Sequence, residues 1–113
     1  MISVFAGQWS DSHDVCNGFG VSPDTLKHSR VFVAFYEYED DGGYAFVLYA
    51  KEGVLYEVHG SHCSCYGLEE QWQPEETTIE ALTHWVKHGV GKKYMDGQEL
   101  KVLSSVKRYL SKF

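Results

Sequence analysis

Two histidines and two cysteines fall within seven positions of this 113-residue sequence, in the stretch HGSHCSCY that covers 59–66. The chain has only one other cysteine. Thiolate and imidazole are the ligands that zinc prefers, and a thiolate beside an imidazole base is also the pairing used by cysteine nucleophiles. These residue types therefore point to a metal site, to a reactive thiol, or to a turn that is rich in small polar residues.

A zinc site is the first interpretation of this stretch. Four donors are needed, normally from two separated segments, and an extended chain would place His59, Cys63 and Cys65 on one face. His13 and Cys16, spaced H-x-x-C, are candidates for the second segment. However, C-x-C is a cramped chelate and the spacing matches no standard zinc signature. We therefore expect no cofactor, with zinc on these residues as the alternative.

A metal- or thiol-dependent enzyme that uses the cluster from His59 to Cys65 is the second interpretation. His62 would point away from Cys63 in an extended chain, so the base would have to be His59 or His84. The sequence contains no nucleophile elbow, phosphate loop, dinucleotide fingerprint or H-E-x-x-H. We assign no catalytic residue. Instead we expect the two cysteines to be half-buried in the crossover from a strand to a helix, without a metal.

A single tryptophan stands among charged residues in EEQWQPEE. Such a residue is typical of a binding anchor, because tryptophan contributes strongly to interface energies. A tryptophan that closes its own hydrophobic core gives the same local pattern. We predict a protein-binding surface here. Its candidate residues are Trp72, Glu69, Glu70, Glu75 and Tyr66.

The charge balance argues against ordinary nucleic-acid binding. The formal net charge is −6, and the basic residues concentrate only at Lys92 with Lys93 and in the closing VKRYLSKF. Phosphate contacts need Lys or Arg along a face, so we expect no nucleic-acid partner. The alternative is an acidic mimic of nucleic acid, since Glu37, Glu39 and Asp41 on one strand face would be ~6.7 Å apart, like successive phosphates.

Length and composition indicate a single domain over 1–113. No apolar run approaches the roughly 20 residues that span a bilayer, and the opening residues lack the pattern of a signal peptide. An odd count of three cysteines suits reduced thiols. We expect a cytoplasmic protein with no membrane contact, and the oligomeric state stays open.

The elements that must position these residues begin with three strands. The runs Val31–Glu39, Tyr44–Ala50 and Val54–Val58 are β-branched and aromatic. Turn residues separate them at Asp40–Gly43 and at Lys51–Gly53. The pattern predicts an antiparallel meander, and because both faces of its first two strands are apolar, each face needs a cover.

Two helices follow the meander. The first opens with the capping box pattern Thr77–Glu80 and stops at Gly89, and the second runs from about Asp96 through Leu110. The first thirty residues predict a strand at ISVFA, a Gly-, Ser- and Asp-rich loop, and one helical turn near Pro23. The expected fold class is α+β: a three-stranded or slightly larger antiparallel meander with two C-terminal helices packed on one face.

The stretch LYEVHGSHCSCYGLEEQWQPEETT resembles a block found in small uncharacterised proteins of tailed phages and prophages. The resemblance covers roughly Val21 to Gly89, and its most specific part is SHCSCYGLE-x-QW-x-PEE. It assigns no activity. It implies a phage accessory protein in the cytoplasm of an infected host cell, with a host bacterial protein, such as a defence or regulatory factor, as the partner.

Overall fold

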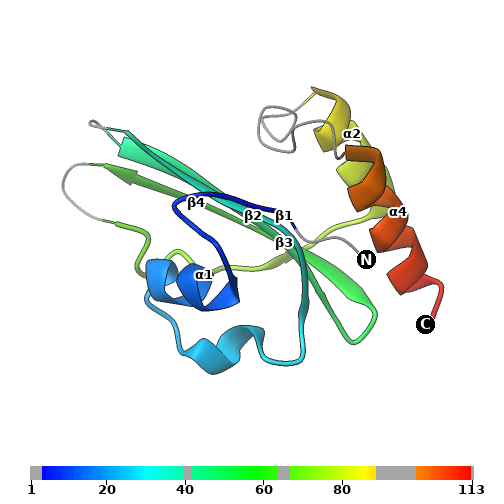
Figure 1. The fold of residues 1–113 in the computed structure, drawn as a ribbon, viewed down its shortest axis with the longest axis horizontal. Helices are drawn as coiled ribbons and strands as arrows, with labels where there is room; N and C mark the ends of the chain where they lie inside the picture. The colour runs from blue at the N-terminus through cyan, green and yellow to red at the C-terminus, as the bar shows by residue number, and fades with distance from the viewer. Residues whose placement is uncertain (1–3, 40–41, 64–66, 89–98, 113) are drawn as a thin grey trace.

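Figure 1 shows the computed structural model, which describes residues 4–39, 42–63, 67–88 and 99–112. A five-stranded sheet in the order β1-β2-β3-β4-β5 carries helices on both sides. The strands are β1 (Val4–Gly7), β2 (Arg30–Glu39), β3 (Gly42–Lys51), β4 (Val54–Cys63) and β5 (Glu75–Glu76). The helices are α1 (Ser12–Phe19), the short 3₁₀ helix η1 (Pro23–Leu26), α2 (Ile79–His88) and α4 (Glu99–Leu110).

The α+β class is confirmed, and the centre of the sheet is the antiparallel run β2-β3-β4. The β3–β4 turn is a two-residue loop, with Lys51 paired to Val54. Glu52 and Gly53 both have positive φ angles, 52° and 84°. Two such residues in a two-residue loop are typical of the hairpin turns whose twist matches that of the strands. The other expected turn includes residues 40–41, which lie outside the described residues.

The sheet as a whole is not a purely antiparallel meander. β1 pairs with β2 in parallel, with Val4 opposite Val33, and the two-residue β5 pairs antiparallel with β4, with Tyr56 opposite Glu76. The parallel pair arises because α1 and η1 carry the chain from the end of β1 back to the start of β2. A parallel neighbour requires a crossover of this kind, which a tight turn cannot provide.

The crossover helix α1 replaces most of the loop that the sequence predicts before residue 20. Asp11 caps its start, accepting a hydrogen bond from the Asp14 backbone N–H at 2.9 Å. Gly20 ends it in the left-handed region, with φ 69°. Its buried side chains are Val15, Cys16 and Phe19. The loop prediction was wrong because α1 is short and buries only one stripe of residues. Most of its residues are polar, which is also the pattern of a loop.

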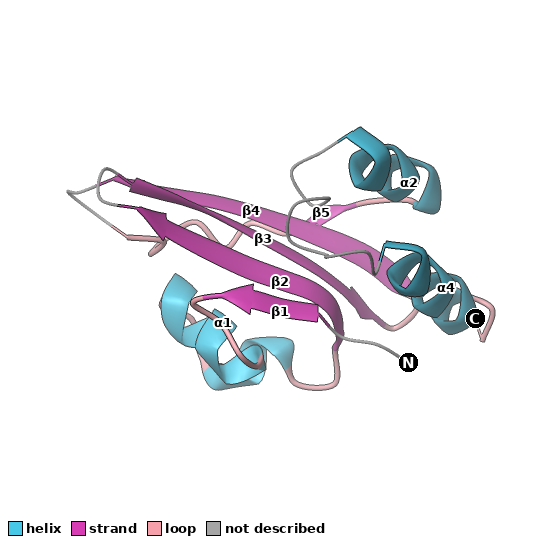
Figure 2. Cartoon of the chain, turned by 45° about the horizontal axis from the view of Figure 1, so that its top comes forward, coloured by secondary structure: helices cyan, strands magenta, loops and turns pink. Residues whose placement is uncertain are grey.

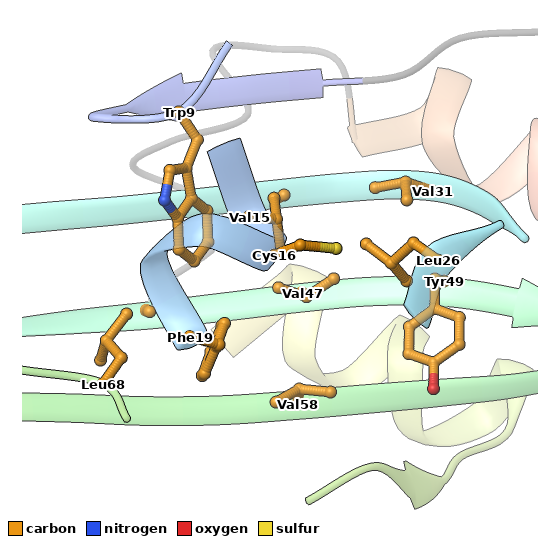
Figure 3. Packing of buried hydrophobic residues seen from close by; sticks show 12 residues of the cluster. Trp9, Val15, Cys16, Phe19, Leu26, Val31, Val47, Tyr49, Val58 and Leu68 are labelled. Carbon is orange, nitrogen blue, oxygen red and sulfur yellow. The ribbon is translucent and has the colours of Figure 1, made fainter. Parts of the chain in front are cut away.

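Helices cover both faces of the sheet, as the apolar strands require (Figure 2). One face packs against α2 through Leu82 and against α4 through Val102 and Val106. We call it the α4 face, and it confirms that both C-terminal helices lie on one side. The opposite face, here the α1 face, packs beneath α1 and η1 (Figure 3). Its buried residues include Trp9, Val15, Cys16, Phe19, Leu26, Val47, Val58 and Leu68.

The start of α2 differs by one position from the predicted capping box. Thr78, not Thr77, precedes the first helical residue, and its hydroxyl oxygen accepts a hydrogen bond from the Ala81 backbone N–H at 3.1 Å. The residue three positions after the cap is therefore Ala81, so Glu80 cannot complete the reciprocal bond of a capping box. The predicted start of the last helix, Asp96, lies outside the described residues.

Candidate functional site

Trp72 lies over the α1 face and touches two aromatic rings. Its ring centroid is 5.1 Å from that of Phe19, edge to face, and 5.8 Å from that of Tyr49, nearly parallel. Tyr49 in turn stacks on Tyr56 at 5.3 Å. Trp72 is half-buried by these contacts. It therefore covers part of the core and leaves another part of its side chain exposed. The position is compatible with both interpretations of this residue, a binding anchor and a residue that closes its own core.

The chain before Trp72 is fixed by a buried leucine and by a glutamine. Leu68 is buried against Phe19 on the α1 face, where Gly60 makes room. A Cβ on Gly60 would lie 3.0 Å from side-chain atoms of both residues. The Gln71 side chain accepts from the Ser61 N–H at 2.9 Å and donates to the Ser61 carbonyl at 2.6 Å. The amide thus occupies the backbone N–H and carbonyl of Ser61, which a neighbouring strand could otherwise pair with at this edge of β4.

The acidic side chains around Trp72 are exposed but do not form one patch. Glu75 is opposite Glu57 in the β4–β5 register, and Glu76 is opposite Tyr56. Successive strand residues point to opposite faces, and Tyr56 belongs to the α1 face. Glu75 therefore lies on the α4 face, away from Trp72. Glu69 stays on the Trp72 side, beside Gly20 at the end of α1. Tyr66 lies outside the described residues.

The structure does not bring His59 together with the predicted second segment of a zinc site. His59 packs edge-on against Phe46 of the α4 face, with ring centroids 5.1 Å apart. Cys16 is buried on the α1 face, and His13 is exposed on α1. Because the sheet separates the two faces, neither Cys16 nor His13 can share an ion with His59.

Within the described residues, no group of three His, Cys, Asp or Glu side chains could hold a metal ion. Cys65 and the side chain of Cys63 lie outside this description, so their predicted packing stays a prediction. Burial raises the pKa of the Cys16 thiol, and a hydrogen bond with the Leu26 backbone opposes this rise more weakly. Cys16 is therefore a protonated packing residue, unlike the low-pKa thiols of reactive cysteines.

A hydrogen-bonded array on the α4 face links three side chains that the sequence does not place together. The Tyr44 hydroxyl is 2.7 Å from His59 Nδ1, and His59 Nε2 is 2.9 Å from Glu57 Oε1. The His59 and Glu57 side chains are 42% and 28% exposed. We assign the His59 tautomer with its proton on Nε2, so that Glu57 accepts from Nε2–H and Nδ1 accepts from the tyrosine hydroxyl.

The order Tyr44, His59, Glu57 matches that of a nucleophile, a base and an orienting carboxylate. Its electrostatics oppose that function. Burial and, more weakly, the charge of Glu57 raise the pKa of the Tyr44 hydroxyl, which keeps it protonated. Both imidazole nitrogens are also occupied. The array therefore holds its three side chains in place and does not present an activated nucleophile.

Two tyrosines should make the free energy of unfolding decrease at alkaline pH. The pKa of Tyr44 is raised by burial and by Glu57, and that of Tyr49 by burial and by Tyr56. A raised folded-state pKa gives stabilisation that is complete below the unfolded value of about 10 and is lost as pH rises through the folded value.

We therefore expect the urea-derived free energy of unfolding to fall as pH rises above about 10. The double variant Tyr44→Phe/Tyr49→Phe should show a shallower fall. Equal slopes in the parent and the variant would contradict the assignment of these two groups.

The predicted acidic row of a nucleic-acid mimic is only partly within the described residues. Glu37 lies near the end of β2 and is half-buried, whereas Asp41 falls outside them. The mimic therefore stays a prediction, as does the metal- or thiol-dependent enzyme.

Comparison with known proteins gives no family assignment. No protein-family model matches the chain, and neither a curated protein nor a solved structure matches it. In the part of the chain that the structure describes, no helix is long and apolar enough to cross a membrane. A function for this α+β domain therefore has to be inferred from its own surface.

Proposed function

We propose that this chain is a small phage accessory protein that binds a host bacterial protein in the cytoplasm of the infected cell. The binding site is the Trp72 surface, defined as Trp72 with Glu69 and Glu70. The observation that carries this proposal is that Trp72 is held by stacking on Tyr49 and edge contact with Phe19 while it is only half-buried, so that part of its side chain stays at the surface. The resemblance of residues 55–78 to a phage block supports the origin of the protein.

An aromatic side chain that is already held in one position before binding suits a binding anchor. Ordering a free side chain at an interface costs about 0.5–1.5 kcal/mol, and a ring already packed on two neighbours avoids most of this cost. Tryptophan also contributes a large contact area and is enriched among the residues that dominate binding energy. The Trp72 surface therefore combines low entropic cost with a large apolar contact.

The charges next to Trp72 favour a basic partner surface. Glu69 and Glu70 are exposed, and no ion pair between described residues involves either carboxylate. The whole chain carries a net charge of −6. Complementary charge accelerates association and orients the partners. The proposed partner is therefore a host protein with Lys or Arg residues around an apolar recess that accepts the indole.

Charge reversal tests this proposal without disturbing the core. The partner is first identified by cross-linking in host lysate, then purified, and its affinity is measured by calorimetry. Glu69→Lys/Glu70→Lys should raise the dissociation constant by roughly tenfold or more, since each lost charge pair and each new repulsion contributes about 1 kcal/mol. Increasing salt should weaken binding of the parent chain and have less effect on the variant.

The matched control is Asp24→Lys/Glu52→Lys, which changes the net charge equally at two other exposed positions. Its dissociation constant should stay within about threefold of the parent value, which corresponds to less than 1 kcal/mol. Equal weakening by both double variants would show that overall charge alone matters and would reject the Trp72 surface. Circular dichroism checks that each variant is folded.

A further inference from the structure

A groove of about 670 Å³ lies at the end of the molecule opposite the β2–β3 connection. It forms where the β3–β4 turn, the junction between β5 and α2, and the last turn of α4 meet. Figure 1 shows the end of α4 beside the turn that joins β3 to β4. Its apolar lining comes from Val54, Leu55, Ile79 and Leu110.

Three hydrogen bonds fix the walls of this groove. The Gly53 backbone N–H donates to the Tyr109 hydroxyl at 3.1 Å and ties the β3–β4 turn to α4. The Thr77 N–H donates to the Leu55 carbonyl at 3.0 Å and holds the junction against β4. The Thr78 hydroxyl caps α2 on the third side. The groove is therefore formed before any ligand arrives, as in most binding sites.

The chemistry of the lining selects the ligand. Beside the apolar residues, Glu80 contributes an exposed carboxylate, and none of the described lining residues is Lys or Arg. The side chain of Glu76 points to the α1 face, because Glu76 is opposite Tyr56. An anionic group would be repelled here, whereas a cation would find the Glu80 carboxylate as its acceptor. The volume also lies in the range of about 300–1,000 Å³ that is usual for ligand sites.

We propose that this groove binds a peptide segment of a protein partner in which an apolar side chain is next to Arg or Lys. The apolar side chain lies on Leu55, Ile79 and Leu110, and the cation pairs with Glu80. Charge complementarity to this carboxylate supports this choice, in addition to the apolar lining. The site is separate from the Trp72 surface and does not depend on the function proposed for that surface.

A defined probe tests the groove in the full chain. N-acetyl-leucyl-arginine amide is titrated into the ¹⁵N-labelled protein, and backbone amide shifts are followed by NMR. Saturable shifts should concentrate at Gly53, Thr77 and Thr78. The neutral isostere N-acetyl-leucyl-citrulline amide and the less apolar N-acetyl-glycyl-arginine amide should each bind about fivefold more weakly, the equivalent of about 1 kcal/mol.

Two matched variants localise the interaction. Glu80→Gln should weaken binding of the leucyl-arginine probe by about fivefold. Glu69→Gln removes the same charge at the Trp72 surface and should leave the affinity within about twofold. The proposal would be overturned if no saturable shifts are seen, or if either control probe binds as tightly as the leucyl-arginine probe. Equal effects of the two variants would overturn it as well. Retained amide dispersion in both variants confirms that the fold survives.

Discussion

Replacing Phe19 by alanine should lower the free energy of unfolding by about 3–5 kcal/mol, the usual cost of removing a buried aromatic ring. Phe19 is fully buried, and its ring contacts Trp9 at 5.7 Å and Trp72 at 5.1 Å between centroids. It also fills the space left by Gly60, which brings α1 close to β4. A cavity here would remove the contact between α1 and the segment that carries Trp72.

Urea denaturation followed by far-UV circular dichroism measures this loss. Leu100→Ala is the control, because Leu100 is 78% exposed on α4 and its replacement should change stability by no more than about 0.5 kcal/mol. Trp72 should also become more accessible to a fluorescence quencher in the Phe19→Ala variant. A loss below about 1 kcal/mol would contradict the position of Phe19 at the centre of the α1 face.

The second large effect is expected for Gly7→Ala, at the end of β1. Gly7 has a φ of 68°, and a Cβ built on it would lie 2.0 Å from the Tyr36 carbonyl oxygen. That oxygen accepts the Gln8 N–H at 2.9 Å and is part of the backbone of β2. It cannot move aside without disturbing the pairing of β1 with β2. We expect a loss of about 3 kcal/mol or more from strain and the clash together.

Hydrogen exchange separates this local effect from general instability. Amides of β1 should exchange much faster in Gly7→Ala, while those at the centre of β3 should exchange at the rate that the lower global stability predicts. Gly67→Ala is the matched control, because the nearest atoms that its new Cβ would meet among the described residues belong to the flexible side chain of Glu69. Stability of Gly7→Ala equal to that of this control would show that β1 does not pair as described.

Local sequence patterns predict those helices and strands whose capping, turn and hydrophobic signals lie within one short stretch of the chain. The β2-β3-β4 run follows from β-branched and aromatic segments on either side of turn residues, and α2 from an apolar stripe after threonine and proline. By contrast, the parallel β1–β2 pair depends on α1, whose buried stripe is only Val15, Cys16 and Phe19. Asp11 and Gly20 were available as capping signals at its two ends.

The site depends on long-range pairing that local sequence does not contain. The contact of Tyr44 with His59 follows from the β3–β4 register, in which Phe46 is opposite His59 and Tyr44 is opposite Ser61. A shift of one residue would move His59 to the other face. Likewise, the separation of Glu75 from Trp72 appears only once the two residues of β5 are paired with β4.

The role of Gln71 could not be predicted from its residue type. Glutamine in a charged stretch is usually a solvated surface residue. Here its amide makes three hydrogen bonds, two with Ser61 and one with the Gly67 carbonyl at 2.9 Å. These bonds hold the chain immediately before Trp72 against β4, and they exist only because the chain passes the open edge of that strand.

The Trp72 surface is tested most directly by hydroxyl-radical footprinting of the chain alone and in its complex with the purified host partner. Oxidation of Trp72 should fall by roughly half or more in the saturated complex, because its exposed part becomes buried at the interface. Oxidation of Leu100 on α4 should stay unchanged. Undiminished oxidation of Trp72, with protection of Leu100 instead, would show that the host protein binds elsewhere and would contradict the proposed function.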